Sequence, residues 1–435
     1  MNTYLYMDNY RGFSDTTVPL AGVNFLVGEN STGKTSFLEL LETFFSPPFW
    51  IFEPRFSEGE ALKRHFLDLV SVSSARRDKF TIGVIVFEPT IVNCSATLIT
   101  YKNVDGRPRI SSFSRIRGQQ VKSIRLRQSQ GEDASFKVFS KSENINDVDA
   151  YTSSDLFVKS CVIHHSTDKG MKHFDIPENV RGAPLLFMCS KILSLTGEES
   201  SKQVSIDIPS TFGKRFVSLA PIRTKPRRTY DRPQTAFSPE GGHTPYVIRK
   251  KLSSKNEVNH FKEFIDRAGQ ESGLFDSVRI REYGRGSAAP FELDIVLGKN
   301  ALSIDNVGYG VSQSLPVFVE MFVRSKDTVF SIQQPEVHLH PRAQATIGGL
   351  IAELARLEGK NFFVETHSDF TIDRFRLNIR KYGKLPVDSQ LLFFERANGG
   401  NKVTSIGIDE NGDISESQPA GYRAFFMSEQ LDILS

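Results

Sequence analysis

The residues from Gly28 to Thr35, Gly-Glu-Asn-Ser-Thr-Gly-Lys-Thr, have the types and the spacing of a phosphate-binding loop. They fit the pattern G-x-x-x-x-G-K-[ST], in which backbone N–H groups surround the phosphates of a nucleoside triphosphate. In such a loop Lys34 reaches the outer phosphates, and the Thr35 hydroxyl ligates Mg²⁺. The residues expected to contact the nucleotide here are Gly28, Asn30, Ser31, Thr32, Gly33, Lys34, Thr35 and Ser36.

The elements that must hold this loop lie on either side of it. Val23 to Val27 is a short apolar run, typical of a buried strand, and Thr35 to Phe45 has apolar residues at helical spacing. Strand, glycine loop and helix start together put the positive helix end beside the phosphates. Upstream, strands are expected at Thr3–Asn9 and at Thr16–Val27, and Ser46-Pro47-Pro48 is expected to end the helix.

Length and composition describe a globular chain. Its 435 residues, 39% apolar and 24% charged, suffice for two or three domain cores. No apolar run approaches the ~20 residues of a membrane helix, and the start of the chain lacks the order of a signal peptide. Cys94, Cys161 and Cys189 are too few and too scattered for a disulfide framework. We therefore expect a cytoplasmic protein with no membrane partner.

The pattern changes after the first helix. From Lys79 to Ser140 apolar residues alternate with period two, which predicts a β-rich, antiparallel insertion. A helix is expected near Leu185–Leu195, a Pro- and Arg-rich loop over 221–245, a helix near Asn256–Ala268 and strands from Ser277 to Val296. The boundaries expected are 1–45 and 301–380 for the two parts of a head, 46–200 for the insertion, 201–300 for a connecting lobe and 381–435 for a β extension.

A phosphate loop needs a partner strand that presents a metal ligand and a base. Thr328 to Gln334 supplies an apolar run that leads into a polar pair, followed by Pro335-Glu336-Val337-His338-Leu339-His340-Pro341. A second short strand ends in Glu365-Thr366-His367-Ser368-Asp369, and Gly308-Tyr309-Gly310-Val311-Ser312-Gln313 opens the helix before the first of these strands.

This order resembles the ATP-binding-cassette ATPase heads of the SMC/RecF/OLD clan. Within that clan it is most similar to the small bacterial ATPases with a PExHLHP motif that occur in anti-phage defence operons, such as those of PARIS, Septu and retron systems. The resemblance covers Asn9-Tyr10-Arg11-Gly12-Phe13 through the loop helix, and about Pro221 to Arg380. Residues 46–200 match only in being an insertion.

The resemblance implies an α/β P-loop head, split in sequence by the β-rich insertion, that binds ATP with Mg²⁺. It implies that Arg11 lies near the nucleotide and that His367 is a switch residue that senses the γ-phosphate. In such heads ATP lies between two subunits, so the resemblance also implies a homo-oligomer, a dimer or a multiple of it. The implied signature that closes on a partner's ATP is Gly308, Gly310, Ser312 and Gln313.

The chain departs from the family at the first of these strands. The family has an acidic residue where Gln333 stands, and commonly another at Gln334. An amide is a weak Mg²⁺ ligand and cannot act as a general base, so hydrolysis should be slow unless Glu336 or Glu365 substitutes. Two explanations are open: a natural ATP-gated binding protein, or a Glu-to-Gln change introduced to trap ATP. We favour the second for Gln333.

Two basic segments are candidates for binding a partner or nucleic acid. Residues 106–131 contain seven basic side chains and no acidic one, and strand alternation is expected to put Arg115, Arg117, Arg125 and Arg127 on one face. A solvated sheet face is the competing interpretation. The loop with Arg223, Lys225, Arg227, Arg228 and Arg232 is equally compatible with a phosphate or partner site and with an exposed linker.

The function expected from these features is an ATP-binding sensor and scaffold in anti-phage defence. Too few residues follow Asp369 for a nuclease domain, so a toxic effector, first of all a nuclease, should be encoded separately and a phage component should be the trigger. The alternative is a RecF-like repair ATPase that binds duplex DNA. The ATPase subunit of a transporter is disfavoured, because the signature is atypical and a large insertion separates the halves.

Overall fold

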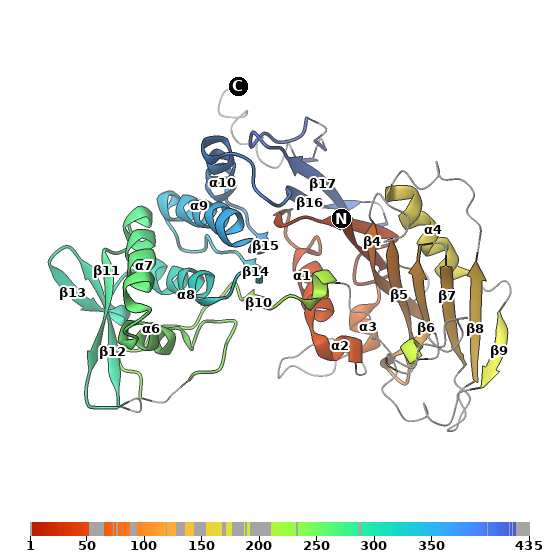
Figure 1. The fold of residues 1–435 in the computed structure, drawn as a ribbon, viewed down its shortest axis with the longest axis horizontal. Coiled ribbons are helices and arrows are strands. Elements are labelled where there is room, and N and C mark those ends of the chain that lie inside the picture. The colour runs from red at the N-terminus through yellow and green to blue at the C-terminus, as the bar shows by residue number, and fades with distance from the viewer. Residues whose placement is uncertain are drawn as a thin grey trace. The chain divides into compact units, whose positions relative to one another are not determined.

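The computed structural model shows a mixed α/β protein made of two compact units (Figure 1). One comprises Met1–Ala21, Glu29–Lys214 and Phe393–Ser405, and the other comprises Gly22–Gly28, Arg215–Leu392 and Ile406–Ser435. The α/β fold class is as predicted. The residues described are 2–51, 65–72, 74, 77–87, 94–118, 120–127, 135–142, 154–167, 171–175, 187, 189–191, 210–231, 234–286, 289–397, 399–416, 418–419 and 421–422.

In its described part, the first unit is built on an eight-stranded sheet with the order β2-β1-β4-β5-β6-β7-β8-β9. Every neighbouring pair in it is antiparallel, as the period-two pattern predicts. The strands are β1 (Asn2–Asp8), β2 (Thr16–Leu20), β4 (Lys79–Phe87), β5 (Ser95–Val104), β6 (Arg107–Arg117), β7 (Gln120–Arg127), β8 (Ser135–Ser142) and β9 (Lys172–Asp175). Two strands from before the phosphate loop thus join strands from after it.

Helix α4 (Ser154–Ser166) covers part of one face of this sheet. Tyr6, Ile85, Leu98 and other apolar residues of that face pack with Phe157 and Cys161 of the helix in a buried cluster. Elsewhere in the described part of this unit are α1 (Lys34–Phe45), α2 (Pro47–Ile51), α3 (Phe66–Leu69) and the 3₁₀ turn η4 (Ser210–Gly213). The helix expected near Leu185–Leu195 falls largely outside the described residues.

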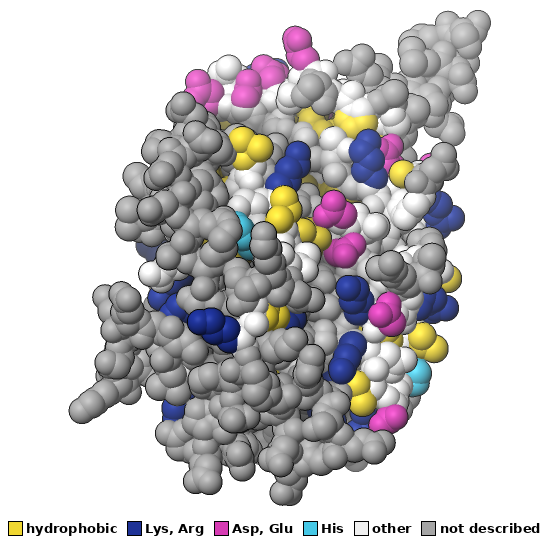
Figure 2. All heavy atoms as spheres, turned by 90° about the vertical axis from the view of Figure 1, so that its right-hand side faces the viewer, with side chains coloured by type: hydrophobic (Ala, Val, Ile, Leu, Met, Phe, Trp, Pro, Cys, Tyr) yellow, Lys and Arg dark blue, Asp and Glu magenta, His cyan; other side chains and the backbone are white. Residues whose placement is uncertain are grey.

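The prediction that four arginines share one sheet face is wrong. Arg115 pairs with Lys122 across β6 and β7, whereas Arg125 pairs with Ser112. Directly opposed residues share a face and successive residues alternate, so Arg125 lies on the face opposite to Arg115 and Arg117. Arg115 donates to the Ser190 hydroxyl at 3.0 Å. Figure 2 shows this unit from the β9 side: among the described side chains basic groups alternate with acidic and apolar ones, without a continuous basic patch.

The second unit is built on a sheet with the order β10-β14-β15-β3-β16-β17, in which β10, β14, β15 and β3 run parallel. Its strands are β3 (Val23–Gly28), β10 (Phe216–Leu219), β14 (Val329–Gln333), β15 (Asn361–Glu365), β16 (Ser389–Ala397) and β17 (Gly400–Ile408). The expected strand Thr16–Val27 is therefore two strands in two different sheets. The chain turns at Ala21-Gly22, where a side chain on Gly22 would come within 2.4 Å of Val387.

Helices α8 (Tyr309–Val323), α9 (Pro341–Glu358) and α10 (Asp369–Tyr382) connect or follow the strands of this sheet, and α8 begins one residue after Gly308, where its start was predicted. Helices α6 (Thr244–Ser253) and α7 (Val258–Ser272) lie beside a three-stranded antiparallel sheet of β11 (Ser277–Glu282), β12 (Phe291–Leu297) and β13 (Asn300–Ser303) (Figure 1). A short 3₁₀ turn, η5 (Ile304–Asn306), leads to α8. No helix in the described ranges is long and apolar enough to cross a bilayer.

His165, in the last turn of α4, makes the stability of the first unit depend on pH. Its ring is buried between the hydroxyls of Ser114, 2.6 Å from Nδ1, and Thr100, 2.8 Å from Nε2. Burial first of all, with the charges of Arg125 and Lys79, lowers the pKa of His165 to about 3. A lowered folded-state pKa gives stability that is present above about pH 6.5 and is lost as the pH falls toward 3.

We expect the free energy of unfolding to fall between pH 6.5 and 4, with His165 contributing up to about 1.4 kcal/mol per pH unit. The variant His165→Gln, which has no titrating ring, should show a shallower dependence. Urea unfolding at pH 7, 6, 5 and 4 measures both slopes, and the difference between them isolates His165 from the carboxylates. Equal slopes in the two proteins would contradict a buried neutral histidine.

Candidate nucleotide-binding site

The phosphate loop has the predicted strand, loop and helix around it. β3 ends at Gly28, and α1 begins at Lys34 with Gly33 as its N-cap. Gly28, Ser31 and Gly33 have positive φ angles of 132°, 62° and 98°, so the backbone curls in a way that favours glycine. Lys34 is buried, and its ammonium donates to the backbone oxygen of Glu29 at 2.7 Å. That ammonium is thus held inside the loop, where phosphate oxygens would compete for it.

The other loop residues divide into buried and exposed ones. Thr32 is buried, and its hydroxyl donates to the Glu29 oxygen at 2.7 Å. Asn30, Ser31 and Thr35 are exposed, and Ser36 is half-buried. The first turn of α1 carries no acidic residue, so nothing on the helix opposes an anion at its N-terminus.

Gly33 is fixed by its neighbour Phe13 from the Asn9–Phe13 segment. A Cβ on Gly33 would lie 2.6 Å from the Phe13 ring and 2.7 Å from the Asn401 amide. Phe13 itself is fully buried and contacts the ring of Phe394 at a centroid distance of 6.4 Å. Phe13 therefore packs directly against Gly33 of the phosphate loop.

The variant Gly33→Ala should be destabilised by roughly 1–3 kcal/mol, because it adds both a left-handed non-glycine residue and a clash. The matched control is Gly213→Ala, where a Cβ meets nothing within 4 Å. Urea unfolding of the two variants gives the comparison. A Gly33→Ala protein as stable as the control would show that the loop relaxes freely.

Arg11 lies against the start of α1. Its guanidinium donates to the Ser36 hydroxyl at 3.1 Å and forms an ion pair with Glu39 at 2.6 Å. Its backbone has a left-handed φ of 48°, and its N–H donates to Leu69. The predicted position beside the nucleotide remains a prediction, but the side chain does reach the turn that follows Lys34 and Thr35.

In the second unit, the carboxyl ends of three parallel strands meet at one edge of the sheet. Gln333 of β14 is paired with Glu365 of β15, and Glu365 is paired with Leu26 of β3. The phosphate loop leaves the sheet at this edge, directly after Gly28. Ligands in open α/β sheets bind outside the carboxyl ends of the strands. Here the residue beside Gln333 is a buried carboxylate, Glu365.

The turn after β14 has unusual backbone geometry. Gln334 and His338 both adopt left-handed conformations, with φ of 42° and 63°. Between them, Glu336 turns back and accepts a 2.7 Å hydrogen bond from the N–H of His367. Burial raises the pKa of the Glu336 carboxyl, and this hydrogen bond opposes the rise. The turn thus joins two of the predicted residues, Glu336 and His367, in one arrangement.

Arg223 is buried, so of the two interpretations left open for its loop the exposed linker does not apply to this residue. Its side chain is 2% exposed, and one guanidinium nitrogen donates to the Gln333 backbone oxygen at 3.2 Å. Its backbone N–H donates to the Gln313 side chain at 3.3 Å. Burial lowers the pKa of Arg223 to about 10, and the Glu336 carboxylate raises it. The Ala-Pro-Ile-Arg segment was the only sequence signal for this residue.

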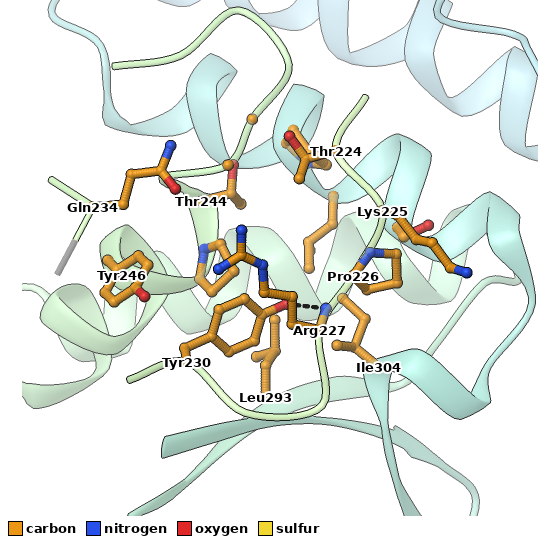
Figure 3. A pocket seen from close by; sticks show the side chains of 16 residues that line it. Thr224, Lys225, Pro226, Arg227, Tyr230, Gln234, Thr244, Tyr246, Leu293 and Ile304 are labelled. Atoms are coloured by element: carbon orange, nitrogen blue, oxygen red, sulfur yellow. Dashed lines mark hydrogen bonds between the residues drawn. The ribbon is translucent and has the colours of Figure 1, made fainter. Parts of the chain in front are cut away.

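The rest of that loop stays exposed. Lys225, Arg227 and Arg228 point toward solvent, and Arg232 falls outside the described residues. Figure 3 shows Lys225, Pro226 and Arg227 around a cavity of about 40 Å³, with the Arg227 N–H donating to the Tyr230 hydroxyl at 3.2 Å. That volume holds a water or two and is too small for a nucleotide.

The predicted signature residues differ in exposure. A Cβ added to Gly308 would meet nothing within 4 Å, whereas a Cβ added to Gly310 would lie 3.0 Å from the His338 backbone oxygen. Ser312 and Gln313 are buried at 5% and 1%, and the Ser312 hydroxyl donates to the Tyr309 oxygen. Their contact with a partner's ATP stays a prediction, and it requires these side chains to turn outward.

The donor groups suit a triphosphate better than a metal ion. The Lys34 ammonium and the backbone N–H groups at the start of α1 are the kinds of donor that fit phosphate oxygens. For Mg²⁺ the predicted ligands are the exposed Thr35 hydroxyl and the Gln333 amide, a neutral pair. Within the described ranges no group of three or more His, Cys, Asp or Glu side chains is placed to hold a metal.

Sequence models of two families match the two parts of the chain. Residues 1–173 match "AAA ATPase domain", and residues 193–373 match "AAA domain, putative AbiEii toxin, Type IV TA system". Both models describe AAA domains, and together with the loop they support an ATP-binding ATPase of the P-loop class. Neither match spans half of the chain. No curated protein matches the sequence.

Solved structures with a similar fold include SMC heads. An SMC head bound to the C-winged helix domain of ScpA has a TM-score of 0.40 at 12% identity, covering 94% of this chain and 97% of its own. The SMC head of Thermotoga maritima has a TM-score of 0.37 at 10% identity, covering 93% and 98%. An SMC head with a coiled coil and joint from Pyrococcus yayanosii has 0.41 at 10%, covering 98% and 99%. These TM-scores are too low to assign a function, so the assignment of this chain as an ATPase depends on the family matches and on the phosphate loop.

Proposed function

We propose that this chain is an ATP-binding sensor and scaffold of a bacterial anti-phage defence system. ATP-dependent oligomerisation would gate a separately encoded toxic effector, of which a nuclease is the first candidate. The observation that carries the proposal is the complete phosphate loop. β14 ends at Gln333 and Gln334 follows it, so this chain has amides at these two positions, whether Gln333 is natural or introduced. A site that holds ATP and lacks carboxylates at these positions is suited to a long-lived bound state.

The defence role is supported by the family description for residues 193–373, which names a putative toxin of a type IV toxin–antitoxin system. ATP would act as the ligand of a switch between a separate and an assembled state. For this, ATP must make contacts in the assembled state that it does not make in the separate one. The signature turn at Gly308–Gln313 and the His338 turn are in contact, so one movement would reach both.

The test is the oligomeric state of the full chain by analytical ultracentrifugation with ATP and Mg²⁺, with ADP, and without nucleotide. We expect a larger species with ATP only, and none with Lys34→Met. The effector is tested by co-expression with the product of the neighbouring reading frame, followed by affinity purification with and without ATP. An unchanged mass together with unchanged effector retention would refute the switch.

The RecF-like alternative gains nothing from the geometry described above, since Arg115 and Arg125 lie on opposite faces of the sheet. Salt-dependent binding of duplex DNA by the isolated chain would revive it.

A further inference from the structure

The first unit contains a cavity whose lining residues are distinct from those of the phosphate loop. It has a volume of about 660 Å³ and lies at the end of α4, where His165 and Ser166 form part of its wall. Known small-molecule sites have volumes of about 300–1,000 Å³. The cavity is therefore large enough for a small organic ligand.

The floor of this cavity is a row of polar residues across the sheet. Asp8 is paired with Thr81, Thr81 with Thr100, Thr100 with Ser112 and Ser112 with Arg125, so all five side chains share one face. The same face is apolar where α4 covers it. The polar residues lie on the part of this face beyond the apolar cluster that packs against α4.

Side chains fix this row in place. The Thr81 and Thr100 hydroxyls are 2.8 Å apart, and Nε2 of His165 lies 2.8 Å from the Thr100 hydroxyl. The Arg125 guanidinium donates to the backbone oxygen of His165, where it also meets the negative end of α4. A fixed set of polar groups around a cavity is a preorganised surface, which lowers the cost of binding.

The charge of the wall favours an anion. Lys79 and Arg125 contribute two positive charges, and Asp8 contributes one negative charge. His165 is neutral near pH 7, because burial lowers its pKa to about 3. Lys79 is exposed and has no acidic partner in the described part of the chain. Met171 adds an apolar group to the same cavity, whereas Phe80 and Leu126, which also line it, carry their side chains on the opposite face of the sheet.

We propose that this cavity is a regulatory site for a phosphorylated small molecule of about nucleoside-monophosphate size. Lys79 and the row of hydroxyls hold the phosphate, and Met171 contacts the rest of the ligand. The binding site stands on its own residues and does not depend on the proposed defence function.

A short path leads from this site to the phosphate loop within the same unit. Asp8 and Asn9 line the cavity, and Arg11 follows two residues later. Arg11 contacts Ser36 and Glu39 of α1. The Asn9 amide donates to the Lys79 backbone oxygen at 2.6 Å, which ties the segment to the cavity wall. A ligand that moves Asp8 and Asn9 would thus move Arg11.

The experiment uses the full chain with Lys34→Met, so that the phosphate loop does not compete. Binding of inorganic phosphate, AMP, GMP, CMP, UMP and unphosphorylated adenosine is measured by calorimetry. The variants Lys79→Glu and Thr81→Val are added singly to this background, with Lys262→Glu on exposed α7 as the control. Thermal melting confirms that each protein is folded.

We expect at least one nucleoside monophosphate to bind, adenosine to bind at least tenfold more weakly, and Lys79→Glu to weaken binding at least tenfold. Thr81→Val should weaken it less, and Lys262→Glu not at all. Failure of every phosphorylated probe at millimolar concentration, or equal binding to folded Lys79→Glu, overturns the site. With Lys34 intact, the bound probe should change ATP affinity at least fivefold, and an unchanged affinity overturns the regulatory role.

Discussion

Replacing Lys34 by methionine is expected to raise the dissociation constant for ATP by about 100-fold or more while leaving the chain folded. The Lys34 ammonium brings a positive charge into the loop, where it donates a hydrogen bond to the Glu29 backbone oxygen. Methionine keeps most of the buried volume but offers phosphate oxygens no donor. The remaining N–H groups of the loop would then bind the triphosphate without charge assistance.

Calorimetric titration with ATP and Mg²⁺ measures this effect. The matched control is Lys299→Met, which changes an exposed lysine between β12 and β13. We expect wild-type affinity for the control and unchanged melting temperatures for both proteins. A Lys34→Met protein that binds ATP within threefold of wild type would show that this loop is not the nucleotide site.

The second large effect is expected at the end of β14. Changing Gln333 to glutamate should raise the rate of ATP hydrolysis by about 100-fold or more, because it restores a carboxylate that can order Mg²⁺ and accept a proton. The new carboxylate would stand beside Glu365, its register partner on β15. Two acids at one sheet edge would bind a divalent cation much better than the present amide and acid.

We would measure steady-state phosphate release by the unchanged chain, by Gln333→Glu and by the control Gln120→Glu. The control changes the exposed first residue of β7. Gln334→Glu should give a smaller gain, because its backbone is held in a left-handed conformation with φ of 42° that aims the side chain differently. If wild type already hydrolyses ATP as fast as Gln333→Glu, another residue supplies the base, and Glu336 and Glu365 become the next residues to change.

The phosphate loop could be predicted because its chemistry depends on local sequence. Gly28, Gly33 and Lys34 fix the loop conformation, and the apolar spacing of the following helix is also local. The same holds for the start of α8 and for β14, which lie within one residue of the predicted positions.

Features that depend on distant parts of the chain could not be predicted. The register between β6 and β7 decides which of their residues share a face, and neither strand reveals this register alone. Arg223 has the composition of an exposed loop around it, yet it is buried by Gln313, Gln333 and Glu336 from elsewhere in the sequence. The polar row in the first unit likewise appears only when five strands are aligned.

The position of β3 inside its sheet has a consequence for synthesis of the protein. Its hydrogen-bonding neighbours are β15 on one side and β16 on the other. Asn24 of β3 donates to Phe362, 338 positions later, and accepts from Gln390, 366 positions later. At translation rates of about 5–20 residues per second, β3 waits roughly 20 to 70 seconds for both partners. An apolar strand left unpaired for that time is exposed to aggregation and to chaperones, and the strand that carries Gly28 gains both of its neighbours only after β16 has been made.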